Sequence, residues 1–96
     1  MSFYRCENRA RVYGPTGRHL GSITDRRVTI WDGTERATWD AFAGGNMLPT
    51  RGDAKADAVA AVLDNAARCG VAPRELAPVT VEYFDPASWR NVGPAA

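Results

Sequence analysis

A single amphipathic helix is the feature that most constrains what this chain can fold into. The segment between Thr50 and Gly70 is rich in alanine, and four apolar residues recur in it at the spacing that forms one stripe along an α-helix. The stripe consists of Val59, Val62, Leu63 and Ala66. Thr50 and Asp53 have the spacing of a capping box at the helix start, and Gly70 supplies a C-terminal stop. Because one helix cannot cover its own stripe, a second layer has to pack against it.

The segment ARVYGPTGRHLG, residues 10–21, has the composition of a β-hairpin. Residues 9–13 alternate between polar and apolar side chains, and residues 18–24 resume a strand-like pattern. Gly14 and Gly17 fall in the connecting turn, where glycine tolerates a positive φ. A phosphate-binding loop of the Walker type needs a longer glycine frame that ends at a helix, so the hairpin is the better interpretation.

Further short strands follow the hairpin and the helix. A turn at Asp25-Arg26 is expected to lead into a strand over residues 28–31, and Asp32-Gly33 is a strong turn dipeptide. Residues 37–42 fit either a fourth strand or a helical turn. The β-branched and aromatic residues 79–84 predict a last strand after the helix.

The element order β-β-β-(β)-α-β predicts an α+β fold, in which a small antiparallel sheet of three to five strands has one amphipathic helix packed on one face. The 96 residues are enough for a single domain, 1–96, with an irregular tail over 85–96. The hydrophobic share of 45% and the charged share of 24% are ordinary for a folded protein. The first residues, MSFYRCENRAR, lack the apolar core of a signal peptide, so a cytoplasmic protein without membrane attachment is expected.

Charge is distributed unevenly along the chain, although the net charge is only +1. Residues 1–51 contain eight arginines against five acidic residues, whereas residues 52–96 contain four basic residues against six acidic ones. Any affinity for a polyanion would therefore lie in the first half.

The alternation of the first strands predicts a candidate binding face. If Ala10, Val12, Val28 and Ile30 face the helix, the opposite face collects guanidinium groups and two large rings. These site residues are Arg9, Arg11, Tyr13, Arg27 and Trp31. Such a face suits nucleic acid, because arginine binds phosphate and aromatic rings stack on unpaired bases. It equally suits a protein partner, since Trp, Tyr and Arg dominate interface hot spots, or it is simply the solvated face of an antiparallel sheet.

A protein partner is the first hypothesis for function. Three tryptophans are many for so small a domain, and the last strand can form an exposed edge that pairs with another chain through Val79, Val81 and Tyr83. The chain is therefore expected to be a small non-enzymatic regulatory protein, of a bacterial or phage accessory type, with an unidentified protein partner or a second copy of itself as ligand.

A nucleic-acid-binding module is the alternative hypothesis. A sheet backed by one helix is also the architecture of AP2-type and integrase arm-binding domains, and residues 44–67 are similar to the strand end and helix of those domains. This likeness is one of element order alone and assigns no family.

An enzyme is the third hypothesis, and it would depend on His19, the one histidine of the chain. Cys6 and Cys69 match no metal spacing, and the acidic residues form no short motif. No metal, no cofactor and no catalytic residue is therefore assigned from the sequence.

Overall fold

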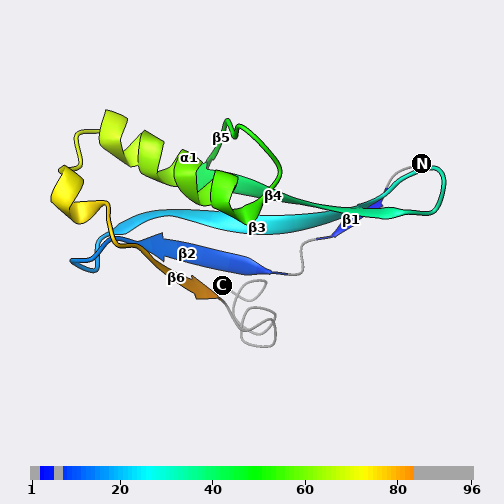
Figure 1. Cartoon of the computed structure of the whole chain (residues 1–96), viewed down its shortest axis with the longest axis horizontal. Helices are drawn as coiled ribbons and strands as arrows, with labels where there is room; N and C mark the ends of the chain where they lie inside the picture. Colours follow the sequence, from blue (N-terminus) through cyan, green and yellow to red (C-terminus); the bar gives the residue numbers. More distant parts are fainter. Residues whose placement is uncertain (1–2, 6–7, 84–96) are drawn as a thin grey trace.

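In the computed structural model, which describes residues 3–5 and 8–83, one helix lies across one face of an antiparallel sheet (Figure 1). The elements in chain order are β1 (Phe3–Arg5), β2 (Arg9–Tyr13), β3 (His19–Thr29), β4 (Glu35–Ala43), β5 (Asn46–Leu48), α1 (Lys55–Arg68), the short helix η1 (Pro73–Glu75) and β6 (Thr80–Tyr83). The predicted α+β class, with its helix on one face, is confirmed. Residues 37–42 belong to a strand, and the predicted tail over 85–96 lies outside the described residues.

The sheet is organised around the long strand β3. Its order is β5-β4-β3-β2-β6, and β1 also pairs with β3. β1 and β2 share one edge of β3, because β1 pairs with residues 27–29 and β2 with residues 19–24. The sequence did not predict the short strands β1 and β5.

The predicted turn at Asp25-Arg26 is wrong, because β3 runs through both residues without a break. The Asp25 carboxylate is buried, and it accepts hydrogen bonds of 2.8 Å from the backbone N–H and from the side-chain amide of Asn8. The Asp25 N–H in turn donates to the Asn8 carbonyl oxygen over 3.0 Å. Asn8 therefore satisfies the hydrogen-bonding groups of Asp25, a residue type that otherwise favours a turn, and β3 continues through it.

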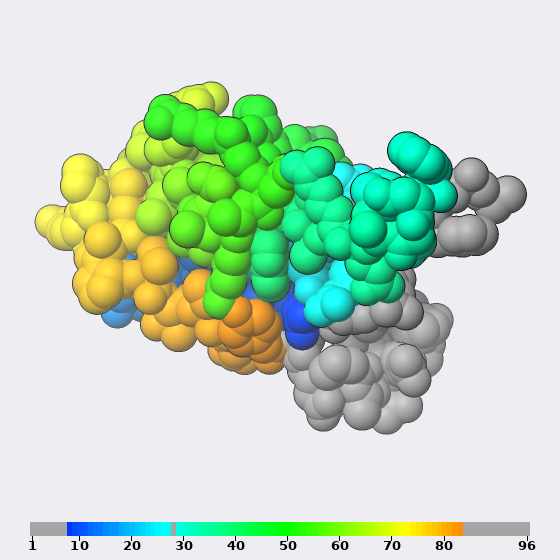
Figure 2. Space-filling view, turned by 45° about the vertical axis from the view of Figure 1, so that its right-hand side comes forward, coloured from blue at the N-terminus to red at the C-terminus, as the bar shows by residue number. Residues whose placement is uncertain are grey.

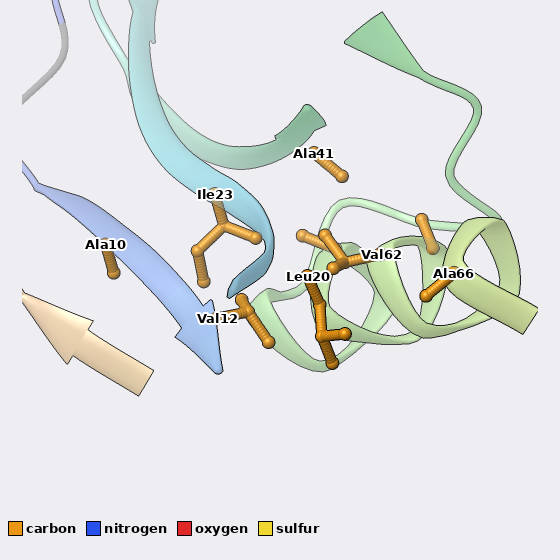
Figure 3. Close-up of a cluster of buried hydrophobic side chains, with 9 residues drawn as sticks. Ala10, Val12, Leu20, Ile23, Ala41, Val62 and Ala66 are labelled. Atoms are coloured by element: carbon orange, nitrogen blue, oxygen red, sulfur yellow. The ribbon is translucent and has the colours of Figure 1, made fainter. Parts of the chain in front are cut away.

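The core lies between α1 and the sheet and is built mainly from small and β-branched side chains. Ile23, Val12 and Val62 are its largest fully buried side chains (Figure 3). Gly21 allows the close approach, because a Cβ there would lie 2.6 Å from the Phe42 carbonyl oxygen and 2.9 Å from a Val62 methyl group. The face that α1 buries is accordingly Ala58, Ala61, Val62 and Ala66, while the predicted Val59 and Leu63 are only half-buried.

The two ends of α1 differ in how well they were predicted. The predicted capping box at Thr50 and Asp53 is wrong, since the helix begins at Lys55 and the Asp57 carboxylate accepts from the N–H of Ala54 over 3.2 Å. The C-terminal stop at Gly70 is confirmed. Gly70 has a φ of +91° and donates to the Ala67 carbonyl oxygen, and Val71 donates to that of Ala66, which is a Schellman motif.

The predicted last strand is present as β6 and pairs antiparallel with β2. Val81 lies opposite Val12 and Tyr83 lies opposite Ala10, so both project to the side that carries the helix. In the described part of the chain no helix is long and apolar enough to cross a membrane.

The pairing of Asn8 with Asp25 leads to a testable prediction for stability. We expect Asn8→Ala to lower the free energy of unfolding by about 1–3 kcal/mol, because a buried carboxylate loses one of its donors. Urea denaturation measures the loss. Asn46→Ala, at an exposed asparagine of β5, is the matched control and should change stability by less than about 0.5 kcal/mol. Equal effects of the two substitutions would contradict the role given to Asn8.

Candidate binding surfaces

The β3–β4 hairpin extends past α1 and carries the turn at its end away from the body of the fold. β3 and β4 stay in register from Ser22 opposite Phe42 to Thr29 opposite Glu35. The helix covers only the part of this ribbon nearer its β5 end (Figure 1). In the space-filling view the turquoise residues around the turn project to the right of the green helix (Figure 2). We call residues 30–34 the hairpin tip.

Four hydrogen bonds hold the hairpin tip in one conformation. The Ile30 N–H donates to the Thr34 carbonyl oxygen, and the Gly33 N–H donates to the Ile30 carbonyl oxygen, both over 2.9 Å. The Asp32 carboxylate accepts from the Thr34 N–H over 2.9 Å and from the Thr34 hydroxyl over 2.7 Å. Gly33 has a φ of +88°, which confirms the turn predicted at Asp32-Gly33. The turn is therefore closed by two backbone hydrogen bonds and by the Asp32 carboxylate.

The hairpin tip exposes apolar surface to solvent. Trp31 is 94% exposed, and its neighbour Ile30 is 38% exposed. The prediction that Ile30 would face the helix is wrong, because Ile30 lies beyond the last residue of β3, where the chain enters the turn. The indole of Trp31 contributes little to the core and is available to a ligand.

The carboxylate of Asp32, next to Trp31 in the sequence, has a lowered pKa. Two hydrogen bonds lower the pKa of Asp32 below the ordinary value of an aspartate: the larger effect is that of the Thr34 hydroxyl, and the smaller is that of the Thr34 backbone N–H. The hairpin tip therefore presents an indole next to a group that is ionised at neutral pH.

The predicted arginine and aromatic face is not assembled as one surface. Arg9, Arg11 and Tyr13 lie on the face of β2 that is turned away from the helix, because Ala10 and Val12 between them are buried in the core. Arg27 lies on the helix-bearing side of the sheet, four residues along β3 from Ile23, and Trp31 lies in the turn. The expected common face is therefore wrong for Arg27 and Trp31, and it holds for the three residues of β2.

Several arginines in and near the hairpin lie close to carboxylates. Arg26 lies 3.5 Å from Asp40, and Arg27 lies 3.8 Å from Glu35. Arg36 donates to Asp53 in the segment that leads into α1 over 2.5 Å. These pairs reduce the net positive charge that the ribbon presents, and exposed pairs of this kind stabilise a fold only slightly.

One cluster on the helix-bearing side was not anticipated from the sequence. The Lys55 ammonium lies 4.5 Å from the ring centroid of Tyr83 and 6.0 Å from that of Trp39, and it contacts the Tyr83 hydroxyl. These are cation–π contacts that tie the start of α1 to β4 and β6. The three residues are far apart in sequence, so no local spacing could have indicated the cluster.

The residues considered for catalysis and metal binding, His19 and Cys69, do not lie in a cluster of metal-binding side chains within the described residues. His19 lies beside Tyr13, with the two ring centroids 5.5 Å apart. Cys69 is an exposed thiol at the C-terminal end of α1, and Cys6 lies outside the described residues. Within residues 3–5 and 8–83 no group of three or more His, Cys, Asp or Glu side chains is placed to hold a metal ion.

No protein-family model, curated protein or solved structure matches this chain.

The contrast between two tryptophans leads to a prediction. We expect Trp31→Ala to change the free energy of unfolding by less than about 0.5 kcal/mol, because its ring is exposed. Trp39→Ala should cost about 2 kcal/mol or more, because the Trp39 ring packs against the core. Urea denaturation of both variants provides the measurement. A large loss from Trp31→Ala would mean that the ring has a structural role.

The Asp32 turn leads to a pH prediction. Thr34→Ala removes the hydroxyl donor, so the pKa of Asp32 should rise toward 3.8. Because the folded state lowers this pKa, the carboxylate stabilises the turn at neutral pH, and the contribution is lost as pH falls through the folded value. Carboxyl carbon chemical shifts over an acid titration measure both values. Thr16→Ala, in the turn between β2 and β3, should leave the pKa of Asp32 unchanged. An ordinary Asp32 pKa in the unmodified protein would contradict the hydrogen bonding.

Proposed function

We propose that this chain is a small non-enzymatic binding protein, of a regulatory or accessory kind, that engages a partner protein through the hairpin tip. The observation that supports this most directly is the 94% exposure of Trp31 at the end of a hairpin that extends past the helix. An exposed tryptophan ring contributes little to the stability of the fold, because it is not buried. Tryptophan is, by contrast, among the residue types most enriched at interface hot spots.

The energetics favour an anchoring role for this ring. Burying an indole removes about 150–250 Å² from water, worth roughly 4–6 kcal/mol before the costs of association. Those costs are of the same order or larger, so Ile30 and the flanking strands have to add contacts. The hydrogen bonds within the turn lower the entropy lost on binding, because the ring is already presented in one backbone conformation.

The chemistry of the hairpin tip limits the kind of partner. Trp31 and Ile30 require an apolar cleft, and the ionised Asp32 beside them favours a basic group at its rim. The partner proposed is therefore a protein with a narrow apolar cleft bordered by lysine or arginine.

A photo-crosslinking amino acid placed at position 31 tests this function in the cells that produce the protein. We expect one defined protein adduct from position 31 and none from position 64, an exposed position of α1 far from the hairpin tip. The captured protein should then bind the purified chain, and Trp31→Ala should weaken that binding by about 2 kcal/mol or more, roughly 30-fold. Equal capture at both positions, or binding unchanged by Trp31→Ala, would contradict the proposal.

Nucleic-acid binding is the second candidate, and one observation favours it. Arg9 and Arg11 are exposed, and with the half-buried Tyr13 they share the helix-free face of β2. Fluorescence anisotropy with single- and double-stranded DNA and RNA at low salt is the direct test. A signal that falls steeply with salt and is lost in Arg9→Glu/Arg11→Glu would favour this function over the first. No signal on any of these probes would remove it.

A further inference from the structure

Among the described residues, nothing in the sheet pairs with the backbone groups on the outer edge of β6. In the described part of the chain β6 pairs with β2 alone and forms the last strand of the sheet order. An edge of this kind is a template for another strand, and proteins usually cover it or block it. The four residues of β6 include no lysine and no proline that would discourage pairing.

The hydrogen bonds of β2 determine which residues of β6 face outward. The Asn8 carbonyl oxygen accepts from Asp25 of β3, so Asn8, Ala10 and Val12 direct their backbone groups toward β3. The residues between them face β6, and the pair of Arg11 and Glu82 is therefore a hydrogen-bonded one. The alternate residues from 79 to 83 therefore direct their backbone N–H and C=O groups away from β2, toward the open edge of the sheet. These residues are Val79, Val81 and Tyr83.

We propose that β6 pairs antiparallel with β6 of a second copy of this chain, with the two Val81 residues opposite each other across a two-fold axis. A two-fold axis perpendicular to the sheet keeps paired residues on the same face and passes midway between two copies of one residue, which face each other at the centre of the ladder. With Val81 at the centre, Val79 lies opposite Tyr83 of the second copy, and Thr80 lies opposite Glu82. On the helix-bearing side, the cross-strand pairs are then formed by Val79, Val81 and Tyr83. On the other side, the hydroxyl of Thr80 lies opposite the carboxylate of Glu82.

The register centred on Glu82 is less favourable on the same criteria. Centring the ladder on Glu82 would place two carboxylates directly opposite each other, which destabilises a strand pair. The Val81 register avoids this repulsion and uses the outward backbone groups of all three apolar residues. Self-complementarity of the edge is therefore the reason to name a second copy as the occupant.

The association is expected to be weak, because a short strand pair buries less than a standard interface. The 10.4 kDa chain should show a concentration-dependent monomer–dimer equilibrium by analytical ultracentrifugation between about 10 μM and about 1 mM. This inference does not rest on the hairpin tip, so Trp31→Ala should leave the equilibrium unchanged. A single monomeric species over the whole range would overturn it.

A pair of substitutions at one exposed position tests the charge arrangement. Thr80→Lys should tighten the dimer, because each lysine faces Glu82 of the second copy, and Thr80→Glu should weaken it. Each change is expected to shift the dissociation constant by roughly 2- to 30-fold, since every contact occurs twice. Thermal unfolding checks that both variants fold alike. Shifts in the same direction, or no shift, would overturn the proposed register.

Disulfide trapping tests the register independently, in a background in which Cys6 and Cys69 are replaced by serine. A mixture of Thr80→Cys and Glu82→Cys chains should give a mixed disulfide on oxidation. The two residues would form a non-hydrogen-bonded pair with Cα atoms about 4.5 Å apart, within disulfide range. Neither variant alone should cross-link efficiently. Efficient cross-linking of Glu82→Cys with itself would assign the Glu82-centred register and overturn ours.

Discussion

The fold depends on the pairing of Asn8 with the buried Asp25. A buried carboxylate destabilises a fold unless donors surround it, and Asn8 supplies two bonds of 2.8 Å. This pairing lies where β1 ends and β2 begins along the same edge of β3, so it allows one long strand to receive two short partners. Without a continuous β3, the hairpin would not extend past α1, and Trp31 would not lie away from the core.

Local patterns predicted the elements whose determinants are local. The hairpin turn after β2, the turn at Asp32-Gly33 and the helix stop at Gly70 each depend on a glycine that adopts a positive φ, and all three are present. The start of α1 was placed too early, because the carboxylate that accepts from the N–H of the N-cap residue, Ala54, is that of Asp57, and the helix begins only at Lys55. The buried face of α1 also differs from the predicted stripe, since Ala58 and Ala61 are buried in place of Val59 and Leu63, and Gly21 leaves room for Val62 against the sheet.

The candidate binding face was mispredicted for one physical reason. An aspartate followed by an arginine in a polar context favours a turn, and a turn at Asp25-Arg26 would have reset the alternation of the next strand. The strand instead continues the alternation of side chains without a break, so Arg27, four residues after Ile23, lies on the same helix-bearing side as Ile23. The competing interaction is a contact between residues 17 positions apart, which no local pattern contains. The exposure of Trp31 follows from the same continuity.

The two proposed surfaces have a defined relation to each other. A two-fold axis perpendicular to the sheet at β6 reverses every direction within the sheet, while it leaves both helices on the same side. The two hairpin tips would then point in opposite directions from the ends of one extended sheet. Such a dimer cannot place both tryptophans in one cleft of a single small partner. It would instead bridge two partner molecules, or two sites far apart on a large assembly, and only in that geometry would pairing through β6 raise the overall affinity of the hairpin tips.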